Sequence, residues 1–442
     1  MKNFICAIFL LLPLASRSER PNILLILADD LGYADLGVQG CKQFGTPHID
    51  AIAEKGVRFK QGYVSNSVCA PSRAGILSGR IGIGFEANLP EHSKDGLDPA
   101  LPTMADVMRK AGYKTFCVGK WHLGYGSQFH PNQRGFDEFY GLLGGSRTYY
   151  ADNAEKLAKE GKALERNGVV EEEPPGSYIT DRLTDGAVAY LDGHLASDAS
   201  QPFFMYLSYT APHGPLEPKP GYAERFPEIK SEKRRAYAGL VASLDEGVGR
   251  MLECLRRNDA LEKTLIVFLS DNGGPLEDNA SYNGLLRGKK GSLWEGGVRV
   301  PFLIRWDGVV AAGQVKDEPV SSLDLLPTFE TVAGVNARIK GDGVDLWPLL
   351  SGKMDGLAER GFYWRRGSKA NCALRQGDYK WLENRRTDEQ WLFNIKDDPS
   401  EKSNLLDQYP ERAGEMRKMY ADWERTIPDP AFESGWIPKK GK

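Results

Sequence analysis

The stretch Asn22-Ile23-Leu24-Leu25-Ile26-Leu27-Ala28, followed directly by Asp29 and Asp30, decides the fold of this chain. Its apolar residues are continuous and do not alternate with polar ones, which is typical of a strand that is covered on both faces. Three further runs share this character and also end in polar residues, and they cover residues 114–118, 203–208 and 264–270. We therefore predict four buried parallel strands.

Helical patterns lie between these runs, over residues 49–55, 103–111, 179–191 and 230–257. Strands that alternate with helices predict an α/β fold, in which a mostly parallel sheet is flanked by helices on both sides. Open sheets of this kind bind ligands outside the carboxyl ends of their strands. The polar residues that follow the runs are therefore expected to meet at one edge of the sheet.

A second unit is predicted after about Gly341, which divides the chain into a catalytic domain over 19–341 and a C-terminal subdomain over 342–442. Short strand-like pieces at 373–375, 379–382 and 391–394 precede a charged helical pattern at 410–426. This pattern predicts a smaller antiparallel sheet with one covering helix. The charged stretch 151–176 is expected to be an irregular surface insertion.

Residues 1–18 have the pattern of a signal peptide. Lys2 supplies the positive charge, Phe4 to Leu14 are apolar, and small residues follow at 15–18. The apolar stretch is too short to span a bilayer comfortably. We therefore expect an exported protein, periplasmic or extracellular, without a stable membrane anchor. An uncleaved anchor is the alternative.

The composition is that of a soluble globular protein, with 442 residues, 41% hydrophobic and 26% charged. A formal charge of −3 gives no electrostatic reason to expect nucleic acid as a partner. An anionic substrate would need a local cluster of cations. The oligomeric state is not predicted.

The cysteines Cys41, Cys117, Cys254 and Cys372 are too widely spaced for a metal-binding motif or a dense disulfide framework. One or two disulfides are compatible with export. Cys117 and Cys254 lie in apolar surroundings and are expected in the core.

Hard oxygen donors follow two of the predicted strands, as Asp29-Asp30 and Asp271-Asn272. Three carboxylates brought together would repel one another unless a cation lay among them. Ligation by oxygen alone favours Ca²⁺ or Mg²⁺, whereas zinc prefers His or Cys. Taken singly, an Asp pair after a strand is also typical of a helix cap or a turn.

Cys69 opens the run Cys69-Ala70-Pro71-Ser72-Arg73-Ala74-Gly75-Ile76-Leu77-Ser78-Gly79-Arg80. Proline and Ser after a small polar nucleophile predict a rigid turn that enters a helix. The helix N-terminus and the Arg73 guanidinium would both favour negative charge there. A buried structural cysteine is the simpler alternative.

Basic residues follow other predicted strands. Lys120 and His122 come after 114–118, and His213 follows 203–208. Lys290 lies in Arg287-Gly288-Lys289-Lys290-Gly291, where Lys289 remains an alternative. Together these groups could surround a tetrahedral dianion. The remaining histidines fit no motif and are expected to be surface or structural residues: His48, His92, His130 and His194.

The run from Cys69 to Arg80 and the stretch from Gly112 to His122 resemble the two signatures of formylglycine-dependent sulfatases, the arylsulfatase family of the alkaline phosphatase superfamily. The resemblance extends from Pro21 to Pro399 and implies the alkaline-phosphatase-like fold. It implies a Cys69 that is oxidised to formylglycine (3-oxoalanine) by a formylglycine-generating or an anaerobic maturation enzyme. The resemblance also implies a calcium ion held by Asp29, Asp30, Asp271, Asn272 and the modified Cys69.

The mechanism that the resemblance implies gives each motif residue a role. Hydrated formylglycine at position 69 attacks sulfur, helped by calcium and Arg73. His122 takes the proton from the second hydroxyl, so that the aldehyde re-forms and sulfate leaves. The residues that bind the sulfuryl group and stabilise its charge are Lys120, His213 and Lys290, and His213 with Lys290 protonates the departing alcohol.

Sulfatases of this kind act most often on sulfated polysaccharides or glycosaminoglycans, so a sulfated carbohydrate is the expected substrate. Specificity is expected in the C-terminal subdomain and in the loops at 84–99, 144–176, 215–230 and 275–282. Arg147, Tyr149 and Tyr150 could contact the carbohydrate, although a plain surface role is the alternative for each.

Two other functions stay open at this point. A phosphatase or phosphodiesterase of the same fold would place His where Asn272 stands and Thr or Ser where Cys69 stands. A non-catalytic protein that binds sulfated glycans would result if Cys69 were never oxidised.

Overall fold

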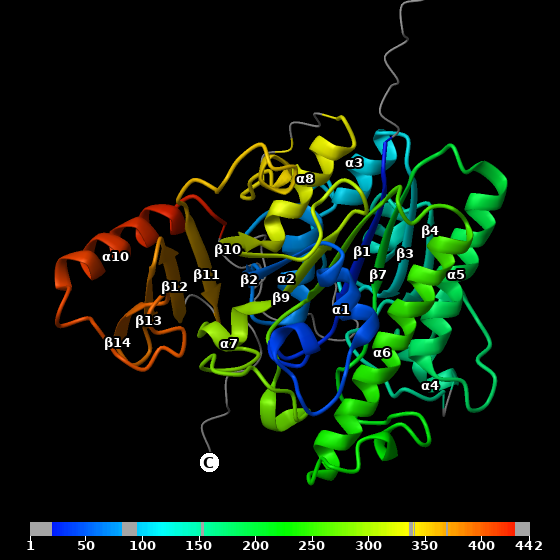
Figure 1. Cartoon of the computed structure of the whole chain (residues 1–442), viewed down its shortest axis with the longest axis horizontal. Helices are drawn as coiled ribbons and strands as arrows, with labels where there is room; N and C mark the ends of the chain where they lie inside the picture. The colour runs from blue at the N-terminus through cyan, green and yellow to red at the C-terminus, as the bar shows by residue number, and fades with distance from the viewer. Residues whose placement is uncertain are drawn as a thin grey trace, which may run out of the picture.

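The computed structural model describes residues 20–81, 95–151, 154–335, 339, 341–367 and 370–428. A large mixed sheet forms its centre, in the order β10-β2-β9-β8-β1-β7-β3-β4-β5-β6 (Figure 1). Strands β8, β1, β7, β3 and β4 are parallel neighbours, whereas β9 and the β5–β6 pair run antiparallel to the strands beside them. The predicted mostly parallel sheet is confirmed.

The strand bounds of this sheet are β1 (Asn22–Ala28), β2 (Val57–Tyr63), β3 (Lys114–Lys120), β4 (Glu138–Leu142), β5 (Glu165–Arg166), β6 (Val169–Val170), β7 (Phe203–Ser208), β8 (Thr264–Ser270), β9 (Arg299–Arg305) and β10 (Gln314–Ser321). All four strands predicted from apolar runs are present.

Helices cover both faces of the sheet (Figure 1). One face packs against α2 (Cys69–Ser78), α3 (Met104–Lys110) and α8 (Leu325–Val332), and the other against α1 (Pro47–Glu54), α5 (Ile179–Asp198) and α6 (Glu232–Arg257). Alternate residues of β1 enter the two cores, Leu25 on one side and Ile26 on the other. A strand buried on both faces has to be apolar throughout, as its sequence is.

Short elements complete the main unit. The helices are α4 (Ala154–Lys159), α7 (Glu295–Val298) and α9 (Trp347–Leu350), and the 3-10 turns are η1 (Gly37–Gln39), η2 (Ser127–Phe129), η3 (Pro131–Gln133), η4 (Ala223–Arg225), η5 (Leu276–Asp278) and η6 (Ser322–Asp324).

The segment 151–176 is more regular than predicted. It contains α4 and the β5–β6 hairpin, and β5 pairs with β4 at the edge of the sheet. The expectation of an irregular insertion was therefore wrong for this part. Edge strands of two residues carry no continuous apolar run, so their sequence lacks the signal that identified the central strands.

The second sheet contains β11 (Gly361–Arg366), β12 (Asn371–Gln376), β13 (Tyr379–Asn384) and β14 (Glu389–Asn394), all antiparallel. Helix α10 (Pro410–Glu424) covers one face, where Tyr363 stacks on Trp423 with ring centroids 4.8 Å apart. The other face packs against the main unit through Phe362, Trp364 and Tyr63. The predicted antiparallel sheet with one covering helix is confirmed.

Cys117 and Cys254 are buried free thiols on opposite sides of the large sheet, as expected for core residues. Within the described part of the chain, no helix combines the length and the apolar character needed to span a membrane. The predicted signal peptide at 1–18 lies outside the described residues.

Candidate active site

The carboxyl ends of β1 and β8 bring two pairs of polar residues together. Ala28 pairs with Ser270 in the sheet, so Asp29-Asp30 and Asp271-Asn272 leave neighbouring strands at the same level. The backbone N–H of Asp30 donates to Asp271 Oδ1 at 3.2 Å, and Asn272 Nδ2 donates to Asp30 Oδ1 at 2.7 Å. All four side chains are buried. The sheet therefore assembles the predicted oxygen donors.

Cys69 is the first residue of α2 and is almost completely buried. Pro71 lies in the first turn, where a missing N–H leaves no helical hydrogen bond unmade. The thiol sulfur lies 3.5 Å from Asp29 Oδ1 and 3.2 Å from Lys290 Nζ. Burial, together with the nearby Asp271 carboxylate, raises the pKa of the Cys69 thiol to about 12. The unmodified sulfur is therefore protonated at neutral pH.

Arg73 lies one turn after Cys69 and its side chain is fully buried. Its Nε and Nη2 both contact Asp271 Oδ2, at 2.9 and 2.8 Å, and Nη1 donates to Ser208 Oγ and to the Lys120 carbonyl. Burial acts to lower the pKa of Arg73, but Asp271 together with the other nearby acidic groups outweighs it, and the pKa lies above its usual range. Arg73 thus ties α2, β8, β3 and β7 together at the site.

Lysines from two other elements reach the same carboxylates. Lys120 ends β3 and its Nζ lies 2.7 Å from Asp29 Oδ2, with both side chains fully buried. Lys290 Nζ lies 2.7 and 2.9 Å from the two carboxylate oxygens of Asp30. Lys289 points elsewhere and pairs with the exposed Glu277 at 2.9 Å. The structure therefore brings Lys290 to the cluster and leaves Lys289 outside it.

His213 follows β7 and its Nε2 lies 3.5 Å from Asp30 Oδ2. Its Nδ1 lies 2.6 Å from the Gly214 carbonyl, and because a carbonyl can only accept, Nδ1 carries a proton. Tyr149 steadies this segment by donating from its hydroxyl to the His213 carbonyl at 2.9 Å. Nε2 is thus the ring nitrogen that faces the site.

His122 is buried two residues after Lys120 and has a φ of 58°, a left-handed conformation that is uncommon outside glycine. A Cβ added to Gly145 would lie 2.6 Å from His122 Nε2, so the ring requires a glycine there. His122 lies outside the compact group of possible metal ligands that Asp29, Asp30, Cys69 and His213 form.

The two aspartates after β1 remain ionised in the interior. Burial alone would raise the pKa of each carboxyl, but the positive charge of Lys120 near Asp29 and of Lys290 near Asp30, helped by His213, holds both pKa values below their usual range. Buried carboxylates that stay charged are available to a cation.

The donor set fits a hard divalent cation. One ligand atom from each of Asp29, Asp30, Cys69 and His213 lies within 4.8 Å of the others. Asn272 Oδ1 is buried without a hydrogen-bond partner among the described residues. A buried amide oxygen without a donor is costly unless something electropositive binds it. The carboxylate and amide oxygens match Ca²⁺ or Mg²⁺, whereas an unmodified thiol and an imidazole are ligands that zinc prefers.

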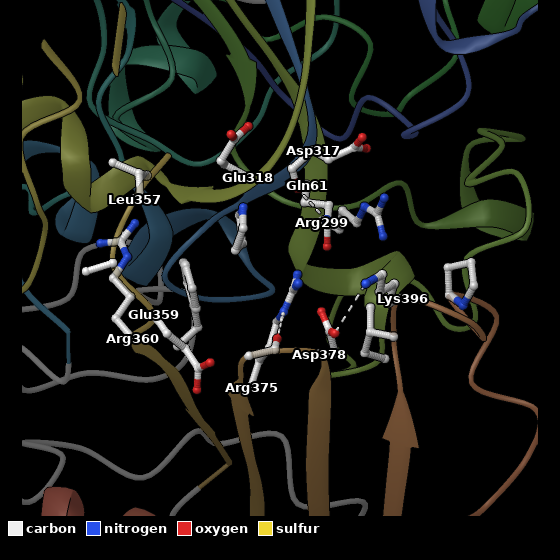
Figure 2. Close-up of a pocket in the computed structure, with 16 residues that line it drawn as sticks. Gln61, Arg299, Asp317, Glu318, Leu357, Glu359, Arg360, Arg375, Asp378 and Lys396 are labelled. Carbon is white, nitrogen blue, oxygen red and sulfur yellow. Dashed lines mark hydrogen bonds and ion pairs between the residues drawn. The ribbon is translucent and has the colours of Figure 1, made fainter. Parts of the chain in front are cut away.

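A separate cavity of about 540 Å³ lies where the two sheets meet and contains none of the predicted site residues (Figure 2). Figure 2 shows Arg375 and Asp378 of the second sheet opposite Gln61 and Arg299 of the main unit. Four basic and four acidic side chains line this cavity, so it has no excess of positive charge to attract an anion.

For Arg147 and Tyr149 both interpretations, a carbohydrate contact and the favoured plain surface role, were wrong because the two residues are buried. The Arg147 side chain is fully buried and pairs with Glu173 at 2.6 Å, and Tyr149 is buried beneath His213. Tyr150 is half-buried against Tyr178. A basic and aromatic cluster in sequence does not reveal a partner such as Glu173, because the two come together only in the folded chain.

Several supporting residues carried no sequence signal. Ser208 accepts from Arg73, and Asn279 Nδ2 donates to the Asp30 carbonyl at 3.2 Å. Two histidines outside the motifs have side-chain partners, His130 with Glu165 and His194 with the Gln201 carbonyl, and His48 is an exposed residue whose backbone N–H donates to Asp245. His92 lies outside the described residues.

Comparison with known families matches residues 21–335 to the Sulfatase model and residues 289–424 to the model "N-sulphoglucosamine sulphohydrolase, C-terminal". The chain is 35% identical to N-acetylgalactosamine-6-sulfatase of Homo sapiens over 370 residues, which cover 79% of this chain and 69% of that protein.

Two solved structures are also similar. The crystal structure of Ps i-CgsB in complex with k-i-k-neocarrahexaose aligns with a TM-score of 0.88 and 38% identity, covering 94% of this chain and 95% of that one. The PsFucS1 sulfatase from Pseudoalteromonas sp. aligns with a TM-score of 0.78 and 26% identity, covering 92% and 90%.

Proposed function

The chain belongs to the sulfatase family of sulfate-ester hydrolases, and we propose that it removes sulfate from a sulfated carbohydrate with the help of calcium and a formylglycine made from Cys69. The observation that carries this proposal is the cluster in which Cys69 contacts both Asp29 and Lys290. Burying this many charges around one thiol costs free energy unless the charges are paired or bind a ligand.

The charges of the cluster support a role in binding an anion next to a cation. Three carboxylates, Asp29, Asp30 and Asp271, stand against three permanent cations. The metal-free cluster is therefore balanced. A divalent ion would leave a surplus of positive charge at Cys69, which a sulfate group would neutralise.

We propose that calcium is held by Asp29, Asp30, Asp271, Asn272 and the modified residue 69. Bound there, the ion would supply positive charge that polarises oxygen atoms at the reacting centre. The choice of calcium over zinc rests on the oxygen-rich donor set and on the unpartnered Asn272 Oδ1.

The state of Cys69 supports its modification. A thiol with a pKa of about 12 is a poor nucleophile at neutral pH, because little of it is ionised. Conversion to formylglycine by a maturation enzyme would supply a hydrated aldehyde, which offers one hydroxyl for attack on sulfur and another for release of sulfate. Position 69, at the start of α2, would keep this group fixed by the helix.

We assign the roles of the surrounding residues from their positions. Lys120 and Lys290 would bind the sulfuryl oxygens. Lys120 pairs with Asp29, which contacts Cys69, and Lys290 contacts Cys69 itself. His213, through Nε2, would give a proton to the leaving oxygen. Arg73 would hold Asp271 and the start of α2 in place, and His122 would take the proton that leaves residue 69.

The similar proteins support a proposal for the substrate class. One structural relative was solved with a neocarrahexaose, and the curated relative is named for an N-acetylgalactosamine-6-sulfate ester. We therefore propose a sulfated polysaccharide or glycosaminoglycan as the substrate. Export across a membrane, which the 1–18 pattern predicts, would place the enzyme where such polymers occur, and N-terminal sequencing of the mature protein would test it.

The test combines turnover with a chemical probe. Wild-type protein made with a maturation enzyme should label with an aldehyde-reactive probe and release sulfate from at least one member of a panel of sulfated oligosaccharides. Cys69→Ala should lose both signals while its thermal unfolding stays close to that of wild type. A buried cysteine of the core, mutated as Cys117→Ala, is the matched control and should keep the label.

Two results would contradict the proposal. Undiminished sulfate release by Cys69→Ala would remove Cys69 as the nucleophile. Faster hydrolysis of phosphate esters than of sulfate esters, with a requirement for zinc, would favour a phosphatase of the same fold.

A further inference from the structure

The end of β11 brings a basic side chain of the second sheet toward the active site. Side chains alternate along a strand, so Phe362, Trp364 and Arg366 share one face. Phe362 and Trp364 pack on Tyr63 of the main unit, each with ring centroids 5.5 Å apart. Arg366 therefore lies on the face of the second sheet that packs against the main unit.

Hydrogen bonds attach this end of β11 to the segment that leads into Cys69. Trp364 Nε1 donates to the Val64 carbonyl at 2.7 Å, and Asn66 Nδ2 donates to the Arg365 carbonyl at 3.2 Å. Both contacts fall on the stretch between the end of β2 and the start of α2. The second sheet is thus bound beside the nucleophile and not only to the outside of the main unit.

Arg366 itself reaches the loop that carries Lys290. Its Nε donates to the Gly291 carbonyl at 3.4 Å, and Gly291 in turn donates its N–H to the Ser67 carbonyl at 2.8 Å. Lys290, the residue before Gly291, contacts Cys69 Sγ. Arg366 is therefore separated from the reacting centre by a single turn of this loop.

Arg366 is half-buried at this position. Burial lowers the pKa of Arg366. The guanidinium stays charged at any physiological pH. A planar guanidinium can bind a sulfate or carboxylate group through two parallel hydrogen bonds.

We propose that Arg366 is a specificity-determining residue, which binds a second anionic group on the sugar that carries the scissile sulfate ester or on the sugar next to it. This inference rests on the proposed function. Under that function the transferred sulfate is bound by the fully buried Lys120 and by Lys290, which contacts Cys69, whereas the half-buried Arg366 contacts the residue after Lys290. The C-terminal sheet would then select multiply charged substrates over singly charged ones.

The experiment compares kcat/KM for three kinds of substrate: nitrophenyl sulfate, a monosulfated disaccharide, and disaccharides that carry an added sulfate or an added carboxylate. Arg366→Gln should lower kcat/KM by about 10- to 100-fold for the substrates with the added group, as expected for a lost charged hydrogen bond, and leave the others close to wild type. Arg366→Lys should restore part of the loss. Arg417→Gln, an exposed arginine of the same subdomain, is the matched control and should change none of these values.

The outcomes separate this inference from the proposed function. An equal loss on all substrates would place Arg366 on the transferred sulfate and overturn the inference, and no loss on any substrate would overturn it as well. Thermal unfolding of each variant, together with Arg366→Lys, shows whether a loss comes from misfolding. A wild-type enzyme that releases no sulfate would instead refute the proposed function, and the inference with it. Added sulfate and added carboxylate, tested separately, show which group Arg366 prefers.

Discussion

Among the described residues, two clusters of buried charge differ in a way that separates the proposed catalytic site from the structural support of the fold. The catalytic-edge cluster contains Asp29, Asp30, Asp271, Arg73, Lys120 and Lys290. The junction cluster, at the interface of the two sheets, contains Glu295, Lys380 and Glu401. In the junction cluster Lys380 Nζ lies 2.9 Å from Glu295 and 3.0 Å from Glu401, and all three side chains are fully buried.

The carboxylates of the two clusters respond to burial in opposite ways. In the junction cluster, burial raises the pKa of Glu401 from 4.5 to about 7. Burial also acts to raise the pKa of Glu295, but Lys380 and two arginines together outweigh it and hold that pKa at about 2. Glu401 can therefore be neutralised by a proton. At the catalytic edge, Asp29 and Asp30 both have lowered pKa values. Both carboxylates therefore stay charged and are available to a metal ion.

The two clusters also differ in how accessible they are to solvent. The junction cluster is closed, and Tyr63 adds a further hydrogen bond to Glu295 at 2.7 Å. At the catalytic edge, Lys290 and His213 keep 17% and 24% of their side chains exposed, which leaves a route for a substrate. A buried ionic cluster becomes a site when it stays charged and opens to solvent on one side.

The largest effect is expected from a neutral substitution at the catalytic edge. Asp29→Asn removes a proposed calcium ligand and the partner of Lys120, and turnover should fall by about ten-thousand-fold, or roughly 5 kcal/mol in the activation barrier. Sulfate release measures this. Added calcium should raise the unfolding temperature of wild type but not of this variant. Turnover within tenfold of wild type would contradict the assignment of Asp29.

The second-largest effect is expected on stability, when a substitution breaks the junction cluster. Lys380→Met leaves Glu401 buried without its cation and leaves Glu295 with Arg299 as its cationic partner, which should lower the free energy of unfolding by about 3–5 kcal/mol. Urea unfolding followed by fluorescence measures the change. Lys396→Met is the matched control, because Lys396 is 70% exposed and its nearest acid is 3.7 Å away, and it should change the stability little. Equal effects of the two substitutions would show that the junction cluster does not stabilise the docking of the sheets.

The smallest effect concerns pH. Because the pKa of Glu401 is raised from 4.5 to about 7 in the folded protein, its contribution to stability is complete below about pH 4.5 and is lost as the pH rises through 7. Wild-type unfolding free energy should therefore fall across this window by on the order of 2 kcal/mol relative to Glu401→Gln, which mimics the protonated form.

Urea unfolding at several pH values tests this expectation. A difference between Glu401→Gln and wild type that does not vary between pH 4.5 and 7 would contradict it. Sulfate release by the variant should stay close to wild type, in contrast to Asp29→Asn.

The sequence was most informative where a short stretch of chain predicted both a secondary-structure element and the position of the functional residues at its end. The apolar run 22–28 predicted a strand buried on both faces, and its end placed Asp29 and Asp30 at the edge where Asp271 and Asn272 also emerge. Local rules failed where the structure depended on distant partners. The pairing of β5 with β4 and the ion pair of Arg147 with Glu173 are examples.

What the sequence alone determined was the family signature around Cys69, the mostly parallel sheet and the set of polar groups at its strand ends, because each depends on a short stretch of chain and on the fixed direction of parallel strands. Only the tertiary structure decided which of Lys289 and Lys290 reaches Asp30, that Lys380 lies between Glu295 and Glu401, and that Arg366 comes to lie beside Gly291. These contacts join residues far apart in the chain. Their energy depends on packing and burial, which appear only when the two sheets meet.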